Sequence, residues 1–162
     1  RGRQGAAGTA QDLAAAAGEQ EWVATAPVVI AFCVKLSPDL RSVPEDDFSW
    51  KLNRLRFGQD LLDYFNAFPD RLAGRTFWDS SVPLTAGQQI HLAAAAHDLG
   101  SCWIGYLDIP RASSLLGLPQ DMACLFLMPI GYPDEEPRQV ERRPQAEFVF
   151  HDHWDAESCP QA

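Results

Sequence analysis

The chain has 162 residues, of which 46% are hydrophobic, and a formal net charge of -9. This length and composition predict one domain with a buried core, and they exclude an intrinsically disordered chain. The negative charge argues against binding to nucleic acid or to an anionic membrane surface, so we expect a small or neutral partner. No apolar run approaches the roughly 20 residues that span a bilayer, and the first residues do not resemble a secretion signal. We therefore expect a cytoplasmic protein.

The cysteines and histidines predict neither a disulfide framework nor a metal site. The four cysteines are widely spaced: Cys33, Cys102, Cys124 and Cys159. Three of them lie in apolar runs, where a free thiol behaves as a small hydrophobic group. His151 and His153 share one face of an expected strand, but no further ligands follow at a usable spacing, so we interpret them as solvated. The common nucleotide-binding, zinc-protease and hydrolase motifs do not occur.

The expected elements begin after a glycine-rich opening. Residues 1–12 have no periodic apolar face, which predicts a mobile lead-in. A helix is expected from Leu13 to Val23, and the β-branched run from Ala26 to Val34 predicts a strand covered on both faces. Residues 37–47 are rich in Pro, Ser and Asp and predict a loop. We expect one domain over residues 13–155 and a tail over residues 156–162.

Two helices are expected in the middle of the chain. Between Phe48 and Phe68 apolar residues recur at helical spacing, which predicts one long amphipathic helix. A second helix is predicted from Val82 to Leu99, with Pro83 in its first turn. Candidate N-caps stand immediately before it at Asp79, Ser80 and Ser81. Its alanine-rich centre is apolar nearly all round, so we expect a buried, central helix.

Shorter elements follow. Gly100 is suited to end the helix in the left-handed conformation, and residues 102–104 predict the start of a buried strand. Pro110 opens a short helix that extends to Leu116, and the apolar residues 123–133 predict another strand. The segment AEFVF, residues 146–150, predicts a last strand. Because helices alternate with strands, we expect a layered α+β or α/β fold.

The order of several motifs resembles the C-terminal two-thirds of the FMN-dependent nitroreductase family. These motifs are APVVI, AGQQIHLAAAAHDLG, SCWIG, LGLP and PIGYP, followed by arginines and a final tryptophan. The resemblance implies an α+β fold, with a central mixed or antiparallel sheet flanked by helices, in an intertwined homodimer that binds FMN. It also implies electron transfer from NADH or NADPH through FMN to a nitroaromatic, a quinone or another small flat acceptor.

The same resemblance implies which residues contact the flavin ring. Trp103, Ile104, Gly105 and Tyr106 match the segment whose backbone N–H groups meet the N5 and O4 edge of the ring. A glycine allows such a close approach because it has no side chain. Relatives often have a second small residue where this chain has Tyr106. The tyrosine ring is therefore expected either to narrow the pocket or to turn outward into the core.

The resemblance further implies a contact with the FMN phosphate. Arg142 matches the family arginine that reaches the phosphate, and the adjacent Arg143 is the alternative. A guanidinium suits this role because its planar donors bind two oxygens at once. A lysine that often precedes this arginine by two positions is replaced by Val140. The competing interpretation is that both arginines are solvated residues of the tail.

The first third of the family pattern, including an arginine-rich phosphate-binding motif, does not occur before Leu13. We therefore expect either part of a longer chain or a shortened relative with weakened or lost cofactor binding. The leading hypothesis is an FMN-dependent NAD(P)H oxidoreductase, with no catalytic side chain assigned. The alternative is a non-catalytic dimerisation or small-molecule-binding module of the same fold. Flavin destruction, dehalogenation and azoline oxidation also occur on this scaffold, and the fold alone does not choose among these reactions.

Overall fold

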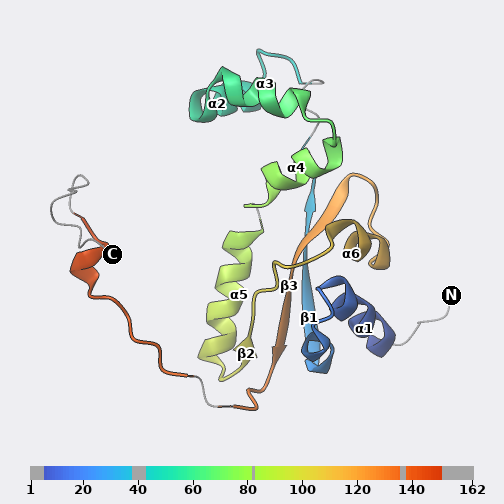
Figure 1. Ribbon diagram of the computed structural model, residues 1–162, viewed down its shortest axis with the longest axis vertical. Helices are drawn as coiled ribbons and strands as arrows, with labels where there is room; N and C mark the ends of the chain where they lie inside the picture. Colours follow the sequence, from blue (N-terminus) through green and yellow to red (C-terminus); the bar gives the residue numbers. More distant parts are fainter. Residues whose placement is uncertain (1–5, 38–42, 82, 136–137, 151–162) are drawn as a thin grey trace.

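A three-stranded antiparallel sheet forms the centre of the protein (Figure 1). The computed structural model describes residues 6–37, 43–81, 83–135 and 138–150. The strands are β1 (Val28–Lys35), β2 (Gly100–Ser101) and β3 (Met122–Gly131), in the order β1-β3-β2. Helices precede, connect and flank these strands, so the fold is α+β, as predicted.

The long pair of β1 and β3 corresponds to the two apolar runs that predict strands. Their register shifts once, because Phe32 lies opposite Phe126 whereas the next residue, Cys33, lies opposite Cys124. Leu125 is therefore an extra residue on β3, as in a β-bulge. A bulge changes the strict alternation of side chains between the two faces of a sheet. As a result, Leu125 and Phe126 both line a groove, while Cys124 is buried with the helices of the other face.

Helices lie on both sides of the sheet (Figure 1). One side carries α1 (Ala6–Ala16), the 3-10 helix η1 (Glu21–Thr25) and α6 (Ile109–Leu115). Leu13 and Ala16 of α1 join Ala112 of α6 and Leu127 of β3 in one buried cluster. The other side carries α5 (Leu84–Ala96). The helix α6 packs directly on β3, and α1 packs against α6 and η1.

The first helix differs from its predicted bounds. It begins at Ala6 and ends at Ala16, and η1 follows as a separate turn, so the single helix over residues 13–23 is wrong. The chain turns between them at Gly18 and Glu19, which have φ angles of 70° and 59°. Residues 6–12, expected as a lead-in, are helical, because alanine favours a helix even where no apolar stripe guides it. Residues 1–5 lie outside the described residues.

The prediction of one long helix over residues 48–68 is wrong. The structure has α2 (Phe48–Phe57) and α3 (Gln59–Ala67), separated by Gly58 with φ 78°. A positive φ ends a right-handed helix, and glycine adopts it without a steric penalty. A further helix that the sequence analysis did not predict, α4 (Arg71–Asp79), connects this pair to the sheet. Figure 1 shows α2 and α3 beyond one end of the sheet, with α4 between them and the strands.

The helix α5 lies at the surface of the single chain, so the expectation of a buried, central helix is wrong here. Of its residues only Gly87 and Ala94 are buried, whereas Leu92 is 60% exposed. Its N-cap is Pro83, with no side-chain hydrogen bond, so the predicted caps at residues 79–81 are also wrong. Asp79 belongs to α4 and binds Ser37 instead. Several alanines of α5 are also exposed, beside Gln88 and Gln89.

Two predicted strands do not form in the described residues. Residues 102–104 follow β2 without extending it, although Ile104 forms an isolated bridge with Leu127. Residues 145–147 form the 3-10 helix η3, and residues 148–150 are not in a strand. A strand needs a neighbour for its main-chain hydrogen bonds, and this segment runs away from the sheet (Figure 1). The short helix predicted from Pro110 to Leu116 is confirmed as α6.

Candidate functional site

The segment between β2 and α6 is fixed to the sheet at one residue. The N–H of Ile104 donates to the oxygen of Leu127 at 2.9 Å, and the N–H of Leu127 donates to the oxygen of Ile104 at 3.1 Å. The Ile104 side chain is 3% exposed and belongs to the cluster under α1 and α6. Gly105 comes directly after it and is exposed. The buried Ile104, with its two main-chain hydrogen bonds to Leu127, therefore fixes the position of the exposed Gly105.

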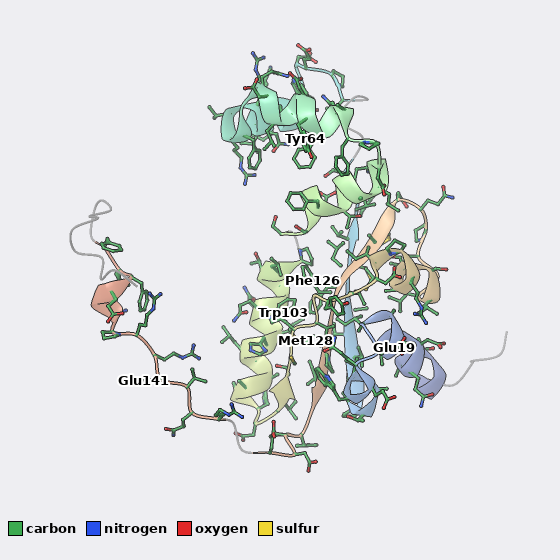
Figure 2. All side chains as sticks on the ribbon, viewed as in Figure 1. Glu19, Tyr64, Trp103, Phe126, Met128 and Glu141 are labelled. Atoms are coloured by element: carbon green, nitrogen blue, oxygen red, sulfur yellow. The ribbon has the colours of Figure 1, made fainter. Side chains whose placement is uncertain are left out.

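Trp103 packs between α5 and the sheet. Its ring centroid lies 5.1 Å from that of Phe32 and 5.7 Å from that of Phe126, the latter in an edge-to-face arrangement. A Cβ atom on Gly87 of α5 would overlap the Trp103 ring, so this position needs glycine. Figure 2 shows Trp103 and Phe126 between α5 and the helices of the other side. Trp103 thus packs beneath α5 and does not line the groove beside Gly105.

Tyr106 takes neither of its two expected positions. Its ring is 78% exposed and lies over Gly18, where an added Cβ atom would overlap it. The ring lines a separate cavity of about 340 Å³, together with Asp108 and Arg111 among others. It does not line the groove beside Gly105, and it is not part of the core. The glycine at position 18, with φ 70°, makes room for it next to α1.

Gly105 lines an open groove of about 490 Å³ between α4 and the segment that leads into α6. Most of the lining side chains are apolar: Leu72, Ala73, Phe77, Leu107, Ile109, Pro110, Leu125 and Phe126. A Cβ atom on Gly105 would lie 3.7 Å from the Phe126 ring, which is ordinary contact. The absence of a side chain at Gly105 therefore relieves no clash but leaves main chain exposed. A groove of this size and lining suits a small flat ligand.

Polar contacts hold α4, one wall of the groove, against the end of β1. Asp79, 5% exposed, accepts hydrogen bonds from the N–H of Ser37 at 2.6 Å and from its Oγ at 2.7 Å. Nε of Arg75 donates to the oxygen of Ser37 at 2.6 Å, and its Nη2 donates to that of Leu36 at 3.2 Å. Hydrogen bonds to charged groups are stronger than neutral ones. These four bonds therefore fix the wall relative to the sheet.

The charged groups of the groove are acidic. Asp70 caps α4 by accepting from the N–H of Ala73 at 2.9 Å, and Asp108 caps α6 by accepting from the N–H of Arg111 at 3.0 Å. Both carboxylates are exposed and line the groove. Among the described residues that line it, none is a lysine, an arginine or a histidine. Within this part of the chain, the groove favours a neutral or cationic ligand over an anionic one.

Arg142 and Arg143 are not brought to the groove within one chain. Both are exposed and precede η3 (Gln145–Glu147) on the extended C-terminal segment. The guanidinium of Arg143 lies 5.7 Å from the centroid of the Phe148 ring of the same segment. Figure 2 shows the neighbouring Glu141 far from Trp103 and Phe126. The two predicted parts of the site, for the ring and for the phosphate, are therefore separate in the single chain.

Sequence reasoning missed α4 and two residues that shape the groove. Asp79 resembles a cap because it precedes Pro83, and nothing local indicates its bonds to the distant Ser37. Phe126 lies in a continuously apolar strand, so the pattern does not show which face it occupies. A signal for α4 does exist, because Asp70 follows Pro69 at the start of the helix and is a good N-cap.

Some of the residues that bear on a metal site or a disulfide lie outside the described ranges. Within the described ranges, no group of three or more His, Cys, Asp or Glu residues could hold a metal ion. His151, His153 and Cys159 fall outside those ranges. Cys33, Cys102 and Cys124 are free thiols. No helix in the described part of the chain has the length and apolarity needed to cross a membrane.

Comparison with known proteins decides the family. The model of the nitroreductase family matches residues 2–132, which is most of the chain. The chain belongs to the nitroreductase family. A curated relative, the NADPH-flavin oxidoreductase of Vibrio harveyi, is 40% identical over 68 residues, which are 41% of this chain and 28% of that protein.

Solved structures of other proteins share the fold of this nitroreductase-family chain. The structure of B. megaterium NfrA1 is similar with a TM-score of 0.60 and 23% identity, over 94% of this chain and 56% of that one. The NADPH:FMN oxidoreductase from Vibrio harveyi, complexed with NAD+, is similar with a TM-score of 0.56 and 25% identity, over 92% and 56%. The chain therefore spans about half the length of these relatives.

Proposed function

We propose that this nitroreductase-family chain is a flavin-dependent oxidoreductase. It would take electrons from NADH or NADPH through FMN and pass them to a nitroaromatic, a quinone or another flat acceptor. The observation that carries this proposal is the exposed main chain of Gly105 at an apolar groove, held in place by the two hydrogen bonds between Ile104 and Leu127. The names of the similar Vibrio harveyi sequence and structure, NADPH-flavin oxidoreductase and NADPH:FMN oxidoreductase, support the flavin and the donor.

The lining of the groove supports the ring of FMN as its ligand and does not support the FMN phosphate there. Its volume of about 490 Å³, its apolar walls and the uncovered glycine suit a flat aromatic system. The phosphate needs cations, whereas the charged groups among the described lining residues are Asp70 and Asp108. Because the C-terminal segment runs away from its own sheet (Figure 1), we propose that Arg142, or Arg143 in its place, reaches the phosphate at the groove of a second copy.

When bound, FMN would supply a group that accepts a hydride and returns electrons to an acceptor. The residues of this chain would orient the ring and stabilise charge on it. The main-chain N–H of Gly105 would donate to the ring edge, where negative charge develops on reduction, and a dipole fixed by the sheet needs no reorganisation. Phe77, Leu107 and Phe126 would keep water out of the groove. No side chain of the groove is needed to move a proton in this proposal.

The proposed oligomer is a homodimer with α5 in its interface. This helix exposes Leu84 and Leu92 and several alanines on a domain that has no further element to cover them in the described residues. An apolar surface of this kind is typical of a permanent interface. Use of a nicotinamide donor further implies a cytoplasmic location.

A second candidate function is a non-catalytic module that binds a small aromatic molecule. The observation that favours it is the acidic rim of the groove, where Asp70 and Asp108 oppose an anionic cofactor. This module would keep the groove and the dimer interface. It would bind neutral or cationic aromatic compounds without FMN.

The deciding experiment is titration of the purified chain with FMN, followed by NADH or NADPH and a quinone. The proposal predicts a stoichiometric complex with a flavin absorbance band at about 450 nm, and nicotinamide oxidation that depends on FMN and on the acceptor. A chain that takes up no FMN, yet binds a neutral aromatic dye at the groove, would support the second candidate instead. Binding of FMN without nicotinamide oxidation would limit the function to flavin binding.

A further inference from the structure

Cys33 of β1 and Cys124 of β3 face one another across the sheet. They are direct partners in the antiparallel register, immediately after the point where that register shifts. Both thiols are free. Cys124 belongs to the buried cluster under α1 and α6, and Cys33 packs against the same cluster, so the two side chains share one face of the sheet. This face is separate from the groove, which is lined by Leu125 and Phe126 of the same strand.

The two thiols lie close together, and each donates one hydrogen bond to its own strand. Cys33 donates to the oxygen of Ala31 at 3.8 Å and Cys124 to that of Phe126 at 3.7 Å, and each thiol affects the pKa of the other. The Cys124 residue is 0% exposed, whereas Cys33 is half-buried. Directly opposite side chains in antiparallel strands have Cβ atoms about 4.5–5.5 Å apart, and closer in a non-hydrogen-bonded pair, whereas a disulfide needs about 3.5–4.5 Å. The bond therefore requires a small approach of the two strands. Cys33 is the thiol of the pair that a small oxidant reaches first.

We propose that Cys33 and Cys124 are a modification site, at which a peroxide oxidises the pair to a reversible intrachain disulfide. In the first step Cys33 Sγ attacks the peroxide, gains one oxygen as a sulfenic acid and releases water or an alcohol. In the second step Cys124 Sγ attacks Cys33 Sγ, the S–S bond forms, and the sulfenic oxygen leaves as water. The two thiols lose two electrons and two protons in total, and the peroxide takes up both.

The disulfide would tie β1 to β3 and close the segment that carries α2 to α6. A bond that closes a long segment restricts the unfolded chain more than the folded one, so the oxidised protein should unfold at a higher temperature. The reaction should be slow at neutral pH and faster in alkali. Burial raises the pKa of both thiols, that of Cys124 to about 12, and only the thiolate attacks.

Cys102 provides an internal control. Its side chain is exposed and belongs to the opposite end of the sheet, so it has no cross-strand thiol among the described residues. Exposure alone would make Cys102 the most reactive of these three cysteines. A preference for the pair Cys33 and Cys124 would therefore be due to their register and not to access.

The test treats the folded chain, carrying Cys102→Ser and Cys159→Ser, with hydrogen peroxide, and then alkylates the remaining thiols in denaturant for mass spectrometry. The expected result is a monomeric product that lacks two hydrogens, contains one peptide pair linked through Cys33 and Cys124, and returns to the free thiols with dithiothreitol. Its rate should rise about tenfold for each unit of pH above neutral, with the thiolate fraction.

Three outcomes would overturn the proposal: full alkylation of both cysteines, irreversible oxidation of Cys33 alone, or links only between chains. The Cys33→Ser and Cys124→Ala variants should each lose the linked product. If a variant fails to fold, the same oxidation and alkylation are carried out on the unsubstituted chain. In that chain, disulfides made only by Cys102 or Cys159 would also contradict the proposal.

Discussion

At the scale of residues, the groove depends on contacts between positions far apart in the sequence. The carboxylate of Asp79 on α4 accepts hydrogen bonds from the main-chain N–H and the hydroxyl of Ser37, which follows β1. Arg75 donates to the main-chain oxygens of Ser37 and Leu36. No periodic pattern indicates such a contact, because Asp79 is compatible with the role of a helix cap. The consequence for function is that the wall formed by Leu72 and Phe77 keeps its distance from Gly105.

Replacing Asp79 by Asn should therefore loosen this wall. An amide keeps the size of the side chain but loses the charge, and it presents an NH₂ group where the carboxylate accepts two hydrogen bonds. We expect the free energy of unfolding to fall by about 1–3 kcal/mol and groove ligands to bind more weakly. Urea denaturation measures the first effect. The matched variant Asp12→Asn, at an exposed position inside α1, should change neither; equal losses in both variants would contradict the role of Asp79.

The raised pKa of the buried thiols predicts a loss of stability in alkali. Burial is the main cause of the shift of the Cys124 pKa to about 12, with the neighbouring Cys33 adding to it. The folded chain therefore holds this proton at a pH where the unfolded chain has released it, so stability is complete below the unfolded pKa and falls as pH rises toward about 12. Melting of the reduced protein at about pH 8 and about pH 10 measures the fall. Cys124→Ala should reduce the pH dependence, and an unchanged slope would show that other groups cause it.

At the scale of elements, the sequence predicts best where a single local pattern determines the structure. The apolar runs that become β1 and β3, and the Asp-x-Pro start of α6, lie close to their expected positions. The wrong predictions concern segments whose structure depends on whether another element packs against them. Residues 146–150 have the composition of a strand but no partner strand among the described residues, and no described element covers the outer face of α5. For the same reason, the groove could not be predicted from the segment around Gly105 alone, since α4 supplies its other wall.

Two glycines should respond oppositely to alanine. Gly58 separates α2 from α3 with φ 78°, where a Cβ atom is strained, so Gly58→Ala should destabilise the protein by about 1–2 kcal/mol. Gly8 lies inside α1 with no atom within 4 Å of an added Cβ, so Gly8→Ala should stabilise it by about 1 kcal/mol. Denaturant unfolding of both variants measures the two changes in the free energy of unfolding. Stabilisation by Gly58→Ala would mean that α2 and α3 can join as one helix, and destabilisation by Gly8→Ala would contradict the open space at Gly8.

At the scale of the whole molecule, the single chain exposes features that are typical of a subunit of an oligomer. The outer face of α5 exposes leucines and alanines beside two glutamines and is uncovered by any described element, the C-terminal segment extends away from the sheet (Figure 1), and the charged groups described at the groove are acidic. A second copy would cover α5 and bring Arg142 and Arg143 of its C-terminal segment to the groove. The proposed dimer thus accounts for three observations that the monomer leaves unexplained.

Substitution on α5 tests this assembly. Leu92 is 60% exposed, so Leu92→Glu should be tolerated by an isolated chain but should place a charge in a dimer interface. We expect the unsubstituted chain to sediment as a dimer at micromolar concentration and the variant as a monomer. The control Leu55→Glu, on α2, changes a leucine that is 85% exposed and should leave the dimer intact. A monomeric unsubstituted chain, or dissociation by the control alone, would contradict an interface on α5.

The central claim is that the main chain at Gly105 lies against a flavin ring, and FMN titration of Gly105→Val tests it most directly. The first atom of the new side chain has room beside Phe126, so the fold should tolerate it, while the branched methyl groups would occupy the place of the ring. The control is Gly8→Val, a site with open space on α1 away from the groove. We predict that Gly105→Val weakens FMN binding by about tenfold or more, equivalent to about 1.4 kcal/mol, with a melting temperature no lower than that of the control. FMN affinity equal to that of the unsubstituted chain would contradict the placement of the flavin at this segment.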